Sequence, residues 1–100
     1  MSDTMRNYEI VFIAAPQLDE EGLTALTERV SGWITAAGGD ISRTSVWGRQ
    51  RLAYAIRKQT EGTYVQLDFQ LAPDATREFE RSLRIEENVL RHLLVRLDED

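Results

Sequence analysis

The chain has 100 residues, 42% of them hydrophobic, and a formal net charge of −5 at pH 7. This size allows one core, so we expect residues 1–100 to form a single domain with flexible ends at Met1–Thr4 and Asp98–Asp100. The absence of cysteine excludes a disulfide framework, thiolate metal sites and thiol nucleophiles, and it fits a cytoplasmic location. No apolar run approaches the roughly 20 residues of a membrane span, so we expect no membrane partner.

The first half of the chain predicts a strand, a helix and a second strand. Residues 8–15 are β-branched and aromatic, which is typical of a central strand buried on both faces. Asp19 is a suitable N-cap for a helix that ends at Gly38. Its apolar stripe consists of Leu23, Leu26, Val30, Trp33, Ile34 and Ala37. Residues 40–58 are extended, with a bend or bulge predicted at Gly48.

The second half predicts strand, helix and strand after a polar turn at residues 59–61. Residues 63–71 alternate, with an apolar face of Val65, Leu67 and Phe69 and a polar face of Tyr64, Gln66, Asp68 and Gln70. Pro73 and Asp74 begin a second helix. Its apolar stripe is Ala75, Phe79 and Leu83, and its solvated face is Arg77, Glu78, Glu80, Arg81 and Arg84. Residues 88–97 return to strand character.

This βαββαβ order predicts an α+β fold, a ferredoxin-like sandwich in which a four-stranded antiparallel sheet carries both helices on one face. Right-handed crossovers give the spatial strand order 2-3-1-4. We expect Trp33 and Phe79, the large apolar residues of the two helices, to face the sheet.

The charge is distributed unevenly despite the negative total. Residues 43–60 contain no Asp or Glu, whereas Arg and Lys are frequent there. Within this stretch WGRQRLAYAIRK, residues 47–58, interleaves aromatic and basic side chains, a pattern that can hold phosphates and pack against a base or a neighbouring protein. Ordinary packing of Trp47 and Tyr54, and plain solubility for the basic residues, explain the same pattern. The aromatic signature of the common RNA-recognition module is missing from GTYVQLDFQ at residues 62–70.

Catalytic sites are poorly supported. His92 is the only histidine, and no Cys or second His is available to build a metal site or a nucleophile pair around it. We therefore expect no catalytic residue, no metal and no cofactor. A hydrolase of the acylphosphatase kind would need an Arg-bearing phosphate loop after the first strand, but residues 15–20 read APQLDE.

Four segments of the chain occur together in one known family. They are MRNYEIVFI at residues 5–13, WGRQRLAYAIRK at 47–58, EGTYV at 61–65 and LRIEENVLRHLLVR at 83–96. In their order and spacing they resemble the bacterial small-subunit ribosomal protein S6 family. The resemblance implies the same fold and a structural role in the small subunit. It also implies binding to the central domain of small-subunit (16S) ribosomal RNA together with ribosomal protein S18, on the ribosome in the cytoplasm, with no DNA partner.

Carried over to single positions, the resemblance implies two sets of contacts. The RNA-binding set is Arg6, Tyr8, Arg49, Arg51 and Lys58. The partner-binding set is Trp47, Leu52 and Tyr54. One departure is Ala55, where the family usually has proline, so this edge-strand position gains an N–H group. The alternative function is a ferredoxin-like regulatory domain that binds a small effector or self-associates.

Overall fold

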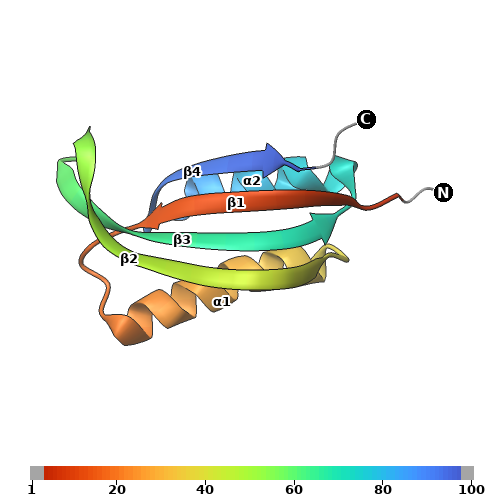
Figure 1. Cartoon of the computed structure of the whole chain (residues 1–100), viewed down its shortest axis with the longest axis horizontal. Helices are drawn as coiled ribbons and strands as arrows, with labels where there is room; N and C mark the ends of the chain where they lie inside the picture. The colour runs from red at the N-terminus through yellow and green to blue at the C-terminus, as the bar shows by residue number, and fades with distance from the viewer. Residues whose placement is uncertain (1–3, 98–100) are drawn as a thin grey trace.

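A computed structural model describes residues 4–97, in which one antiparallel sheet carries two helices on one face (Figure 1). In chain order the elements are β1 Arg6–Ala14, α1 Glu20–Ala36, β2 Asp40–Ile56, β3 Gln59–Leu71, a 3-10 turn Pro73–Ala75, α2 Thr76–Ile85 and β4 Val89–Arg96. The strand order β2-β3-β1-β4 confirms the predicted ferredoxin-like topology. The predicted flexibility of residues 1–3 and 98–100 lies outside the described part of the chain. None of the helices within residues 4–97 is long and apolar enough to cross a membrane.

Helix α1 begins and ends where its capping residues require. The Asp19 carboxylate accepts a hydrogen bond from the backbone N–H of Gly22 at 2.8 Å, as a helix N-cap does. At the other end Gly38 has a φ of 92°, which turns the chain so that the Gly39 N–H reaches the carbonyl of Ile34 at 2.9 Å. Ala37, predicted in the apolar stripe, is exposed because the helix has already ended there.

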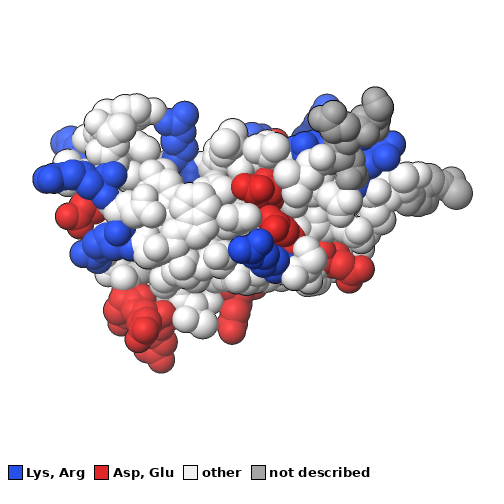
Figure 2. Space-filling view, viewed as in Figure 1, with Lys and Arg blue, Asp and Glu red and all other residues white. Residues whose placement is uncertain are grey.

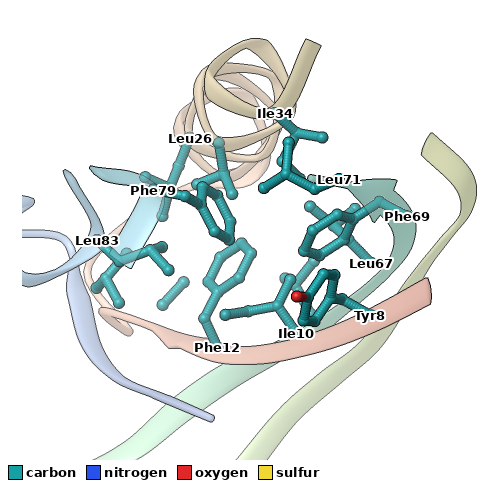
Figure 3. Close-up of a cluster of buried hydrophobic side chains, with 14 residues drawn as sticks. Tyr8, Ile10, Phe12, Leu26, Ile34, Leu67, Phe69, Leu71, Phe79 and Leu83 are labelled. Atoms are coloured by element: carbon teal, nitrogen blue, oxygen red, sulfur yellow. The ribbon is translucent and has the colours of Figure 1, made fainter. Parts of the chain in front are cut away.

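The core lies between the helices and one face of the sheet (Figure 3). Its fully buried side chains come from both helices and from strands β1 and β3, and include Ile10, Phe12, Leu26, Val30, Ile34, Leu67, Phe69 and Leu83. The ring of Phe79 meets the ring of Phe69 edge to face, with centroids 5.5 Å apart. Phe79 faces the sheet as predicted, whereas Trp33 is only partly buried at the margin of the core.

The other face of the sheet has no helix over it. The first strand is central, as predicted, but burial on both faces is confirmed only near its end, at Ile13. Tyr8, Ile10 and Phe12 point into the core, whereas Glu9 and Val11 are partly exposed on this open face. The alternation predicted for the third strand is confirmed, since Val65, Leu67 and Phe69 are buried and their polar neighbours are not.

Strands β2 and β3 form a hairpin that runs beyond the other two strands (Figure 1). The predicted bulge is present, because the register shifts between Val46 and Gly48, where Gly48 has a φ of 102°. The turn was predicted at residues 59–61 but lies at Arg57 and Lys58, whose φ angles of 50° and 67° are left-handed. Two such residues give a turn whose twist matches a hairpin, although Asn-Gly would adopt it at lower cost.

Candidate RNA and partner interface

The hairpin presents different chemistry on its two sides. Arg49 pairs with Thr63 and Arg51 with Glu61 in an uninterrupted register, so both arginines lie on the helix side of the sheet. Leu52 packs instead against Ile13, on the open side. Strand alternation therefore separates the predicted RNA-binding arginines from the predicted partner-binding residues.

The predicted RNA-binding residues of the hairpin differ in how they are held. The Arg49 guanidinium donates a hydrogen bond to the Pro16 carbonyl at 2.7 Å, and a second nitrogen lies 3.6 Å from the Glu61 carboxylate. Within residues 4–97, neither Arg51 nor Lys58 forms an ion pair or side-chain hydrogen bond, and both are exposed. The side chains of Arg51 and Lys58 are therefore free to reach a phosphate. The Arg49 side chain instead links the hairpin to the loop after β1 through its hydrogen bond to Pro16.

The first strand contributes its predicted RNA contacts at the other end of the sheet. Arg6 pairs with Leu71, eight residues along β3 from Thr63, the partner of Arg49, which is about 27 Å in a strand. The ring of Tyr8 is 6% exposed and stacks on Phe69 in the core, with centroids 5.8 Å apart. Because that ring is buried, it cannot stack on a base. Of the two RNA-binding residues predicted in the first strand, only Arg6 has an accessible side chain.

A groove of about 480 Å³ crosses the open face and contains the predicted partner-binding residues. Its lining includes Glu9, Val11, Ile13, Trp47, Leu52, Tyr54, Ile56, Tyr64, Arg91 and Leu93. Leu52 is buried in its floor, whereas Trp47 is 47% and Tyr54 60% exposed. The Trp47 indole lies parallel to the Tyr64 ring, with centroids 5.8 Å apart, and donates a hydrogen bond to Gln66 at 3.2 Å. These two contacts hold the Trp47 wall of the groove in place.

One contact bridges the two edges of the sheet. Strands β2 and β4 are the opposite edges, yet the Arg91 guanidinium on β4 donates a hydrogen bond to the Tyr54 hydroxyl on β2. The same guanidinium lies 6.0 Å from the centroid of the Tyr54 ring. The hairpin therefore bends over the open face, and this contact closes one end of the groove.

Sequence reasoning missed the residues that β1 and β4 bring to the groove. Val11 and Leu93 are register partners on the open face, and Glu9 faces Asp68 across β1 and β3. The alternation of polar Glu9 with buried Tyr8 and Ile10 was the available signal, hidden by the apolar character of residues 10–15.

His92 has a structural contact instead of a catalytic one. Its Nε2 lies 3.1 Å from a carboxylate oxygen of Glu80, and this pair joins β4 to α2. Glu80 was predicted on the solvated face of the second helix but is partly buried beneath this contact. Among residues 4–97 no three His, Asp or Glu side chains gather as metal ligands would.

Charge is sorted over the surface (Figure 2). Lys and Arg gather around the end of the hairpin, and Asp and Glu gather below it over the start of α1, whereas an uncharged area lies beside the basic end, over the middle of the sheet. A molecule with such a charge separation can turn its basic end toward an anionic polymer despite a negative total. The fold, the basic hairpin and the apolar groove together define a binding domain.

The comparisons identify which binding domain this is. The sequence model of the family described as Ribosomal protein S6 matches residues 7–96. The small ribosomal subunit protein bS6 of Moorella thermoacetica is 44% identical over 96 residues, covering 96% of this chain and 98% of that protein. The bS6 protein of Clostridioides difficile is 44% identical over 91 residues, 91% of this chain and 98% of its own.

A solved structure of the same family is similar to this chain. The crystal structure of 30S ribosomal protein S6 from Thermotoga maritima matches with a TM-score of 0.87 at 32% identity, over 93% of this chain and 88% of that one. The chain belongs to the ribosomal protein S6 family. It is accordingly a structural component of the small ribosomal subunit and not an enzyme.

Proposed function

We propose that this chain binds the central domain of 16S ribosomal RNA jointly with ribosomal protein S18, on ribosomes in the cytoplasm. The observation that carries the proposal is the two-sided hairpin, with Arg51 and Lys58 free to meet phosphates and the groove at Trp47 and Tyr54 open to a protein. One rigid element would then touch both partners at once, which is how binding of one can favour binding of the other.

The net charge explains why a second protein is needed. A chain of charge −5 repels RNA at long range, and a few exposed basic groups give weak phosphate binding alone. A neighbour that occupies the groove and brings its own basic groups to the same RNA supplies the missing attraction. The RNA-facing groups of this chain are Arg51, Lys58, Arg49 and, at the far end of the sheet, Arg6.

The test compares RNA affinity with and without S18. We expect filter binding at one fixed salt concentration to give weak RNA binding by the chain alone and an affinity gain with S18 worth about 1–3 kcal/mol. Linkage requires RNA to tighten the protein pair by the same factor. Equal RNA affinity with and without S18 would contradict the joint-binding proposal.

Substitutions test the basic side of the hairpin. Arg51→Ala combined with Lys58→Ala should weaken RNA binding by the protein pair and flatten the slope of log K against log salt by roughly 0.7–0.9 per lost phosphate contact. The matched control is Arg77→Ala with Arg84→Ala, which removes the same charge from the exposed face of α2. An unchanged slope in the hairpin variant would move the RNA site to Arg6.

A further inference from the structure

We infer that the groove on the open face receives an extended apolar segment of the protein partner, and that this segment places a Lys or Arg side chain against Glu9 and Asp68. The inference deepens the proposed function and rests on it, because the occupant is the protein that shares the RNA.

The apolar part of the site is larger than the groove itself. Leu93 is 63% and Val95 39% exposed on the open side of β4, next to the partly exposed Val11 of β1. Exposed apolar side chains that adjoin one another on a small protein mark an interaction site. Since the lining of the groove follows β1 from Glu9 to Ile13, the groove suits an extended peptide segment better than a compact ligand.

The acidic part of the site is a pair of opposed carboxylates. Glu9 and Asp68 are register partners on the open face, and like charges directly opposite each other on a sheet repel. The only hydrogen bond to either carboxylate within residues 4–97 is from the Gln66 amide to Asp68, at 3.0 Å. Arg43 pairs with Asp68 in the register but makes no ion pair with it. Within residues 4–97 neither carboxylate is therefore neutralised by an ion pair, and an incoming cationic side chain can form one.

Charge complementarity selects a basic protein segment over other occupants. A nucleic acid would bring phosphates toward two carboxylates, which is unfavourable. The partner in the proposed complex must itself be basic, because this acidic chain brings few cations to the RNA. A basic side chain that neutralises Glu9 and Asp68 therefore removes a repulsion in this chain and forms an ion pair in the complex.

The groove also gives the segment a direction. Arg91 pairs with Ile13, four residues along β1 from Glu9, which is about 13 Å in an extended strand. The end of the groove at Arg91 favours a carbonyl or carboxylate of the occupant, whereas the end at Glu9 favours a cation. We expect the bound segment to carry these two groups about four residues apart, with apolar side chains between them.

The first experiment neutralises the acidic pair. Glu9→Gln with Asp68→Asn is compared with Glu20→Gln with Glu21→Gln, which removes the same charge from the start of α1. Calorimetric titration with purified S18 should show affinity weakened by roughly tenfold or more in the first variant, with less salt dependence, and unchanged in the control. A melting temperature no lower than that of the unchanged protein shows that the groove variant is folded.

The second experiment identifies what occupies the groove. Because the chain has no cysteine, Leu93→Cys offers a single site for a photoreactive maleimide. Irradiation of the complex with S18 and RNA should attach a peptide of S18 that contains Lys or Arg beside apolar residues. Attachment to RNA, or to a peptide without a basic residue, would overturn the inference.

The outcomes separate this inference from the proposed function. If the unchanged protein binds S18 and the acidic-pair variant binds it equally well, the inference is wrong and joint RNA binding stands. If the unchanged protein does not bind S18 at all, the proposed function itself fails. Sedimentation of the chain alone adds a third outcome, because a dimer that the acidic-pair substitutions dissociate would make the groove a contact between two copies and overturn the inference.

Discussion

The hydroxyl of Tyr54, on one edge strand of the sheet, accepts a hydrogen bond from the guanidinium of Arg91, on the opposite edge strand. This contact holds the bent hairpin over the groove. We expect Tyr54→Phe to leave the ring in place but to loosen the hairpin. Amide hydrogen exchange should then be faster at residues 52–58 and unchanged in α1. The free energy of unfolding should fall by less than about 1 kcal/mol, because the lost hydrogen bond is exposed. Equal exchange in both proteins would show that packing of Leu52 alone positions the hairpin.

Replacement of Arg49 and replacement of Arg51 should change the free energy of unfolding by different amounts, although the two residues lie two positions apart on the same side of the hairpin. Arg49→Ala removes the hydrogen bond to Pro16 and should lower the free energy of unfolding by about 0.5–1.5 kcal/mol. Arg51→Ala removes no such contact and should stay within about 0.5 kcal/mol of the unchanged protein. Chemical denaturation of both variants measures the difference. Equal stability would mean that the Pro16 contact contributes nothing in solution.

Gly62 of β3 is required by its neighbours and not by its own backbone angles. A Cβ atom there would lie 2.3 Å from Cγ2 of Ile13 and 3.2 Å from the carbonyl oxygen of Ala14. Gly62→Ala must therefore displace the Ile13 side chain or β1 itself, and should cost roughly 1–3 kcal/mol in thermal or chemical unfolding. Gly32→Ala is the control, since a Cβ on that exposed helical position meets nothing within 4 Å and should stabilise α1 by up to about 1 kcal/mol.

The two large aromatic residues of the helices, Phe79 and Trp33, should contribute differently to the free energy of unfolding. Phe79 is 3% exposed and packs on Phe69, so Phe79→Ala should lower the free energy of unfolding by about 3–5 kcal/mol. Trp33 lies at the margin of the core, and Trp33→Ala should cost clearly less, because a partly exposed side chain leaves no closed cavity. Urea denaturation of the two variants checks the order, and a larger loss for Trp33→Ala would contradict it.

Much of the fold could be predicted because its determinants are local. Asp19 and Gly38 mark the ends of α1 through hydrogen bonds and a backbone angle that nearby residues supply. The alternation of residues 63–71 identified the core face of β3, and the element order with right-handed crossovers gave the strand order. The turn at Arg57 and Lys58 was misplaced because neither residue type favours left-handed angles.

Ala55 shows how a local rule depends on its surroundings. It belongs to residues 52–55, which have no register partner in β3, so a proline at this position in the family would remove no ladder hydrogen bond. The expected gain of an N–H group at Ala55 is therefore of little consequence for the sheet.

The sequence by itself determined the order of elements, the apolar faces of β3 and both helices, and the concentration of basic residues in the hairpin, because each follows from chemistry repeated at short spacing. Only the tertiary structure decided which of the basic residues are free, since Arg49 meets Pro16 through the packing of the hairpin on a distant loop. The tertiary structure also determined that Tyr8 is buried and that Glu9 lies opposite Asp68. These relationships join residues far apart in the chain, and the pairing and bending of the strands bring them together.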